Sequence, residues 1–271
     1  MTDKKPTIGI FGGSGFYSLL DAARRVIVNT PYGAPSDAVT IGEMEGKTVA
    51  FIPRHGSAHN LPPHAINYRA NLWAMKELGV KQIIGPCAAG SLQPDVKVGE
   101  FVICDQLVDR TNGRADTFYD GPVTTHVSFA DPYCPRMRGL AAESCKAASV
   151  PYKAKGTVVV IQGPRFSTRS ESKWFTGQGW EVINMTQYPE AILARELEIC
   201  YVNISTITDY DAGLTEHPDV KPVSHEEVVK VFGENIEKLK RVLAELISRL
   251  PETPPDGECP CPTALTGARF G

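Results

Sequence analysis

The sequence predicts an α/β fold, because short apolar strands and helical segments alternate along the chain. The strands are short runs rich in Ile, Val and Phe, such as Ile8–Phe11 and Ile199–Ile207. The clearest helix carries one apolar stripe from Val228 to Leu250 at spacings of three and four residues. A chain of 271 residues, 42% of them hydrophobic, can bury one large core. We therefore expect one domain followed by a C-terminal tail.

Strands are expected where apolar runs are short and are bounded by turn residues. The first, Thr7–Phe11, leads into the glycine-rich loop Gly12–Gly15. Glu45-Gly46 separates two runs that should pair as a hairpin. The expected strands are 7–11, 39–42, 48–52, a segment around 83–84, 158–161, 182–184 and 199–207.

Helices are expected where apolar residues recur at helical spacing. The pattern from Ala65 to Met75 stops at Gly79, a typical C-terminal signal. Ser224 and Glu227 form a capping-box pattern at the start of the last helix, which Pro251 ends. The expected helices are 65–79, 189–198 and 224–250. The remaining segment, 251–271, contains proline, glycine and cysteine and is expected to be a poorly packed extension.

The charge balance argues against polymer and membrane binding. The formal net charge is −3 and the isoelectric point is about 6.1, without a basic patch interleaved with aromatic residues. No nucleic-acid partner is therefore expected. No apolar run approaches the roughly 20 residues of a membrane span, so the sequence predicts no membrane partner and a cytoplasmic location.

The loop Gly12–Gly15 bares backbone N–H groups and suits an anion. A dinucleotide fingerprint would require a third glycine where Ser18 stands, and no Walker lysine follows. The loop therefore matches neither an NAD site nor a P-loop.

The seven cysteines are too few and too scattered for a disulfide scaffold, and none forms a Cys-x-x-Cys pair. The sequence therefore predicts no metal site. Cys259 and Cys261 flank Pro260 in the tail, where they form a disulfide or have no role; the residues alone leave both open.

Asp209 and Asp211 close the buried apolar run 199–207, where carboxylates are costly and therefore usually functional. Strand alternation points both to one side, with Tyr210 between them. One carboxyl that donates to a ring nitrogen and one that accepts from an exocyclic amine match an aminopurine.

Four other loops at expected strand ends supply donors for a phosphate dianion. They bring hydroxyls, a guanidinium, an imidazole and backbone amides, from Ser14, Arg54, His55, Cys87, Ala88 and Thr186.

Together these segments resemble the methylthioadenosine phosphorylases of the trimeric purine nucleoside phosphorylase superfamily. The resemblance covers residues 7–250 and is carried by 8–15, 54–56, 67–71, 163–167, 183–186 and 208–211. It implies a nucleoside phosphorylase domain over residues 1–250, built on a central mixed, partly barrel-like β-sheet flanked by helices, with 251–271 as the extension.

The resemblance also implies a role for each site residue. The six phosphate donors named above would bind phosphate, Asn184 and Met185 would meet the ribose, and Phe166 and Ser167 would flank the base. Asp209 would act on N7 and Asp211 on the 6-amino group. His126 would reach a neighbouring subunit's site, which implies a homotrimer or a dimer of trimers.

The implied reaction is phosphorolysis of 5'-methylthioadenosine, with phosphate as co-substrate and no cofactor or metal. A broad or 6-oxopurine nucleoside phosphorylase is the alternative, and a non-catalytic nucleoside-binding protein is a third interpretation. His225 stands where methylthio-specific members carry a small apolar residue, which leaves adenosine open as a second substrate.

The resemblance further implies two disulfides. Cys134 and Cys200 match positions bonded in some family members from hot habitats, which also carry Cys-x-Cys tails. We therefore expect a Cys134–Cys200 bond and a Cys259–Cys261 bond.

Overall fold

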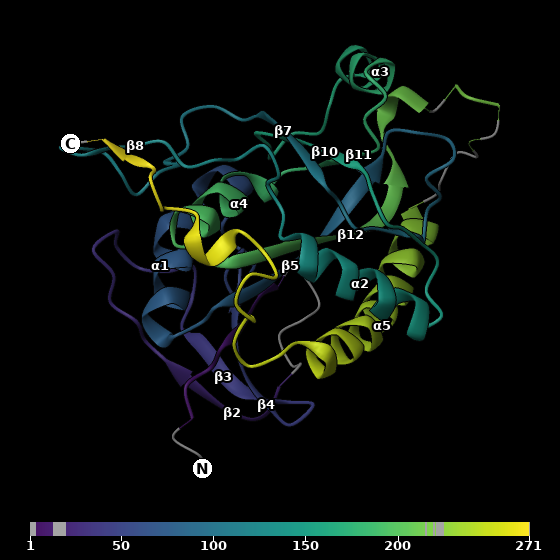
Figure 1. Cartoon of the computed structure of the whole chain (residues 1–271). Helices are drawn as coiled ribbons and strands as arrows, with labels where there is room; N and C mark the ends of the chain where they lie inside the picture. The colour runs from purple at the N-terminus through teal and green to yellow at the C-terminus, as the bar shows by residue number, and fades with distance from the viewer. Residues whose placement is uncertain (1–3, 13–19, 215, 219, 221–224, 271) are drawn as a thin grey trace.

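The structure is a computed structural model that describes residues 4–12, 20–214, 216–218, 220 and 225–270. A mixed β-sheet lies between two helical layers, with α1 and α4 on one face and α2 and α5 on the other (Figure 1). Each layer encloses its own apolar cluster, one around α1 and α4 and one around α2 and α5. The predicted α/β class, with a central mixed sheet flanked by helices, is confirmed.

The strands are β1 Ile8–Gly12, β2 Asp21–Val26, β3 Val39–Met44, β4 Lys47–Pro53, β5 Gln82–Ser91, β6 Phe101–Val102, β7 Gln106–Arg110, β8 Thr124–Thr125, β9 Tyr152–Lys153, β10 Thr157–Ile161, β11 Val182–Asn184, β12 Cys200–Tyr210 and β13 Arg269–Phe270. The α-helices are α1 Tyr68–Leu78, α2 Pro135–Ala147, α3 Arg169–Gly177, α4 Gln187–Glu196 and α5 His225–Arg249, and the short 3₁₀ turns are η1 Pro63–Ala65, η2 Ala212–Leu214 and η3 Cys261–Thr263.

The sheet branches at β5, which pairs with β1, β11 and β12. The order across the main path is β2-β3-β4-β1-β5-β11-β10-β7, and β12 continues through β6 to β9. The strands β1, β4, β5 and β12 run parallel to their neighbours in this group, whereas β3 is antiparallel to β4. Parallel strands bring their carboxyl ends to one edge of the sheet, which is where ligands bind in α/β folds.

The predicted hairpin and the predicted first helix both form. β3 and β4 pair across the turn at Glu45-Gly46, and both turn residues have positive φ. Gly79 caps α1 in the left-handed conformation (φ 99°), as its position predicted. The cap of the last helix at Ser224 lies outside the described residues.

Two helices have no counterpart among the predicted elements. α2 follows Cys134, whose side chain makes no cap hydrogen bond, so its start carries a weak signal. α3 begins with a complete capping box between Thr168 and Glu171, a pattern visible in the sequence. Both were missed because their apolar positions are few.

Parts of residues 251–270 pack against the domain, so the expected poor packing is wrong for those parts. Cys261 is 1% exposed and belongs to the apolar cluster of α2 and α5. The end of the chain adds β13, which pairs with β8 (Figure 1). The Gln82 side chain donates to the Pro251 carbonyl, and the Leu265 backbone N–H donates to the Glu198 carboxylate. These hydrogen bonds attach the tail to the domain.

Within the described part of the chain, every helix is too short or too polar to cross a membrane.

Candidate active site

A cavity of about 750 Å³ opens at the carboxyl-terminal ends of β4, β5, β11 and β12. Its lining includes most of the side chains expected to bind ligand: Arg54, His55, Cys87, Ala88, Phe166, Ser167, Asn184, Met185, Thr186, Asp209 and Asp211. Arg54 and Asp211, which are distant in sequence, therefore meet in one cavity. A cavity of this size accommodates a nucleoside and an inorganic anion together.

The other predicted site residues are not among the described residues that line the cavity. Ser14 and the side chain of His225 lie outside the described residues, although α5 begins at His225. The described lining does not include Tyr210 or His126. His126 follows β8, and its backbone N–H donates to the carbonyl of Ala268 in the tail.

A β-bulge positions the carboxylates. β12 pairs with β5 in parallel, but the register shifts between Ile207 and Asp209, so that Asp209 lies opposite Gly90. Bulges commonly re-aim side chains at active sites, and here the consecutive residues Thr208 and Asp209 both line the cavity. A Cβ at Gly90 would lie 3.1 Å from Asp209 Oδ1, so a side chain at this position would crowd the carboxylate.

Burial raises the pKa of both carboxyl groups. For Asp209, the neighbouring Asp211 charge raises the pKa further, while the Thr208 hydroxyl, which donates to Oδ2 at 2.7 Å, opposes the rise. For Asp211, hydrogen bonds from the Ser172 hydroxyl and the Ala212 backbone N–H oppose the rise. A carboxyl group in this setting retains its proton to higher pH and can act as a general acid.

Two buried polar atoms of lining residues have no hydrogen-bond partner within the described part of the protein. They are Asp211 Oδ2 and Asn235 Oδ1. Unpaired buried polar atoms are costly and normally have a function. Asp211 Oδ2 in particular is an acceptor available to a ligand N–H group.

Arg54 is buried, and its guanidinium forms a two-point ion pair with Glu190. Both side chains are 1% exposed; Nε and Nη2 donate to the carboxylate, the latter at 2.9 Å, and Nη1 donates to the Pro86 carbonyl at 3.1 Å. Burial alone would lower the pKa of Arg54, but Glu190 raises it above its usual value, so the charge is permanent. A guanidinium has five N–H donors; three are used here, and one on each Nη remains for an anion.

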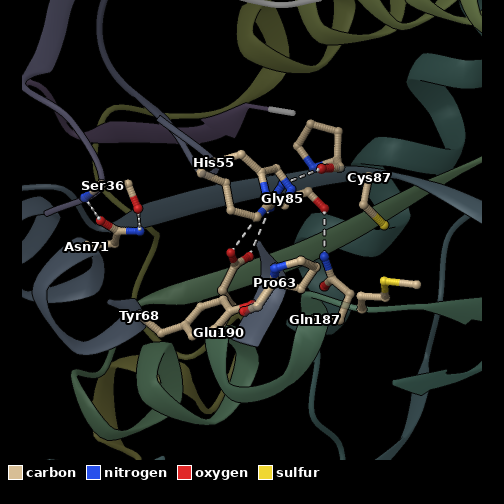
Figure 2. A network of polar contacts seen from close by, with 12 residues as sticks. Ser36, His55, Pro63, Tyr68, Asn71, Gly85, Cys87, Gln187 and Glu190 are labelled. Carbon is tan, nitrogen blue, oxygen red and sulfur yellow. Dashed lines mark hydrogen bonds and ion pairs between the residues drawn. The ribbon is translucent and has the colours of Figure 1, made fainter. Parts of the chain in front are cut away.

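Glu190 belongs to a larger buried network around the start of α4 (Figure 2). Tyr201 donates its hydroxyl to Glu190 at 2.6 Å, with Gln187 Oε1 3.1 Å from the same oxygen, and Gln187 donates to the Gly85 carbonyl at 3.1 Å. The two-point interaction expected between Arg54 and phosphate is thus made with Glu190. The network fixes the orientation of the two N–H groups that Arg54 retains.

His55 is held in one tautomer. Its Nδ1 lies 2.8 Å from the Leu61 carbonyl, which can only accept, so Nδ1 carries the proton. Burial lowers the pKa of His55, and the charges of Arg54 and His59 lower it further. The imidazole is therefore neutral near pH 7, and Nε2 is an acceptor.

Cys87 contributes backbone rather than a reactive thiol. Its sulfur accepts from the Asn184 side-chain amide at 3.2 Å, and burial raises the pKa of the thiol, so a thiolate nucleophile is disfavoured. The next residue, Ala88, is the exposed position of an otherwise buried β5. Thr186 precedes α4, and its hydroxyl makes no cap hydrogen bond to the helix.

Sequence patterns missed several lining residues. α5 contributes Phe232, Asn235, Ile236 and Leu239, and the loop after His55 contributes His59 and Asn60. The apolar stripe of α5 also packs against the core. The sequence alone therefore could not distinguish the residues that line the cavity from those of the core. Glu190 had one detectable signal, a carboxylate within the apolar segment Pro189–Leu193.

Comparisons with known proteins find relatives that match nearly the whole chain. The purine nucleoside phosphorylase of Streptomyces coelicolor is 49% identical over 97% of this chain and 95% of its own length. The S-methyl-5'-thioadenosine phosphorylase of Thermofilum pendens is 49% identical over 98% and 99%. A crystal structure of a methylthioadenosine phosphorylase from an Antarctic soil metagenomic library superimposes with a TM-score of 0.91 at 39% identity, covering 98% of this chain and 93% of that one.

The family model of the phosphorylase superfamily matches residues 7–248, which include every described lining residue of the cavity. This chain therefore belongs to the phosphorylase superfamily.

Proposed function

We propose that this protein catalyses phosphorolysis of 5'-methylthioadenosine, releasing adenine and 5-methylthioribose 1-phosphate. The observation that carries the proposal is that the anion donors of Arg54 and the carboxyl pair Asp209 and Asp211 line one cavity. Several similar proteins are S-methyl-5'-thioadenosine phosphorylases, which are pentosyltransferases. We assign the activity to residues 1–250 and treat 251–271 as an extension of that domain.

At the base, Asp209 delivers a proton or a strong hydrogen bond to N7 as the glycosidic bond breaks. Its raised pKa makes the protonated form available. Asp211 Oδ2, which lacks a partner among the described residues, accepts from the 6-amino group. The pair thus distinguishes an aminopurine, which offers a donor at position 6, from an oxopurine, which offers an acceptor.

At the opposite end, the two N–H groups that Arg54 retains bind the phosphate oxygens. Nε2 of neutral His55 accepts the O–H of the monohydrogen phosphate dianion, which leaves the unprotonated oxygens facing Arg54 and the ribose. As the bond to the purine stretches, positive charge develops on the ribose, and the adjacent phosphate stabilises it and attacks C1'. Ser14, Cys87, Ala88 and Thr186 complete this proposed phosphate site.

The ribose lies between these ends, against Asn184 and Met185, with Phe166 and Ser167 beside the base. An apolar wall from α5, formed by Phe232, Ile236 and Leu239, suits a methylthio group better than a hydroxyl. His225 at the start of the same helix is the feature that favours adenosine as a second substrate.

A broad or 6-oxopurine nucleoside phosphorylase is the second candidate, since a relative of equal identity carries the name purine nucleoside phosphorylase. Against it, an ionised Asp211 would repel a 6-oxo group. A purely nucleoside-binding role would leave the phosphate donors without a purpose.

A substrate panel tests the assignment. In saturating phosphate, kcat/KM for methylthioadenosine and adenosine should exceed that for inosine and methylthioinosine by at least roughly 10²-fold, because unpaired polar groups reject the wrong base strongly. In the variant Asp209→Asn/Asp211→Asn, the ratio should move toward the oxopurines, since amides can donate. Equal rates on all four nucleosides in the unsubstituted enzyme would contradict the base assignment.

We also propose a homotrimer, or a dimer of trimers, in which His126 completes a neighbouring subunit's site. The position of His126 outside its own chain's cavity lining supports this, as do the exposed aromatic side chains of Phe166 (79%) and Trp174 (46%). Sedimentation equilibrium should give three or six times the chain mass of 29.5 kDa. A mass of one chain would contradict the proposal.

A further inference from the structure

A second cluster of chemically capable side chains lies away from the cavity. It consists of four cysteine sulfurs, all within 4.8 Å of one another, from Cys134, Cys200, Cys259 and Cys261 (the four-cysteine cluster). Cys200 begins β12, and Asp209 lies nine residues later on the same strand, roughly 30 Å away at the extended rise. The cluster is therefore separate from the proposed reaction.

The two expected disulfides are not formed in this structure, in which all seven cysteines are free. One contact within the cluster, 3.5 Å, joins Cys200 to Cys259 and so crosses the expected pairs. A disulfide requires sulfurs about 2.05 Å apart. The cluster is instead an arrangement of four thiols around a common centre.

We propose that the four-cysteine cluster binds one Zn²⁺ ion as a tetrahedral structural site. Zinc lies about 2.3 Å from each thiolate, so adjacent sulfurs in a regular tetrahedron lie about 3.8 Å apart. The separations of the cluster, 3.5 Å for Cys200–Cys259 and none above 4.8 Å, bracket that value. Four sulfur ligands in tetrahedral arrangement are typical of structural zinc. The expectation that the chain has no metal site rested on the lack of a Cys-x-x-Cys pair, and the fold supplies the four ligands by another route.

The surroundings suit bound thiolates. Cys134 immediately precedes α2, where the helix dipole favours negative charge. The Arg136 side chain is 8% exposed, and its Nη2 lies 3.9 Å from Cys200 Sγ. Nε and Nη1 of Arg136 have no hydrogen-bond partner in the described part of the chain, and Nε lies 4.0 Å from a carboxylate oxygen of the exposed Glu258 side chain. This buried cation offsets the net negative charge of a zinc ion bound by four thiolates.

The site would join three segments that are distant in sequence. Cys134 belongs to the start of α2, Cys200 to the start of β12, and the other two ligands to the tail. Zinc would therefore fix residues 251–270 to the domain, and its loss should affect stability rather than the chemistry at Asp209.

Metal analysis of the full chain, purified without chelators from zinc-supplemented medium, tests the proposal. We expect about one zinc per chain, as a single tetrahedral site requires. The variant Cys259→Ser/Cys261→Ser should lose the zinc and unfold at lower temperature, with kcat/KM for methylthioadenosine retained below that temperature. Cys145→Ala, a buried cysteine of the same apolar cluster but outside the four, is the matched control and should keep the metal.

A thiol count distinguishes the alternatives. The unreduced protein, denatured in chelator, should show all seven thiols. Three thiols without zinc, the seven less the four in two bonds, would establish the disulfides and overturn the proposal. The proposal would also be overturned if the protein had seven thiols but no zinc, if the double variant kept the zinc, or if the control variant lost it.

Discussion

Asp209→Ala is expected to lower kcat for methylthioadenosine by roughly 10²- to 10⁴-fold, the usual contribution of general acid catalysis. The substitution removes the group that we propose protonates N7, so adenine would have to depart as a poor anion. The KM for phosphate should change little, because Arg54 and His55 are untouched. Asp209→Asn, which can donate a hydrogen bond but not a proton, should fall between the alanine variant and the unsubstituted enzyme.

The pH profile separates this role from a structural one. Because burial and the Asp211 charge raise the pKa of Asp209, the protonated fraction falls as pH rises through that raised pKa, and kcat/KM should fall with it. The alanine variant should lack this limb. If Asp209→Ala turns over at the rate of the unsubstituted enzyme, Asp209 has no part in the mechanism. The same conclusion follows if its kcat/KM shows the same decrease at high pH.

Arg54→Leu is expected to raise the KM for phosphate much more than that for the nucleoside, since in the proposed site two N–H groups of Arg54 bind the anion. It should also destabilise the fold by about 3–5 kcal/mol, because Glu190 is left as an uncompensated buried charge. Thermal or urea unfolding measures the second effect and steady-state kinetics the first.

The double variant Arg54→Leu/Glu190→Leu is the matched control. Replacing a buried ion pair by apolar residues is often close to neutral for stability, so most of the lost stability should return while the KM for phosphate stays high. If the KM for phosphate recovers together with stability, Arg54 acts only by supporting the fold.

Local patterns predicted much of the core of this fold. The hairpin of β3 and β4, the glycine end of α1 and the strands β10 and β11 depend on residues that are neighbours in sequence. The short strands β6 and β9 could not be predicted in this way, because two-residue pairings arise only once distant segments meet.

In the candidate site, too, some features could be predicted from local sequence and others depend on distant segments. The carboxylates at the end of β12 carry a sequence signal, since charge after a buried strand is unusual. The Arg54–Glu190 pair spans 136 positions, and the bulge before Asp209 depends on its register with β5. The four-cysteine cluster likewise requires three separate segments to be placed in space. Long-range packing determines these features.

The most direct test of the central claim is product analysis with methylthioadenosine in the presence and absence of phosphate. If the anion donors and the carboxyl pair act on opposite ends of one nucleoside, adenine should be released only with phosphate. Each adenine should be accompanied by one molecule of 5-methylthioribose 1-phosphate. Adenine release without phosphate, with free methylthioribose as the second product, would contradict the account.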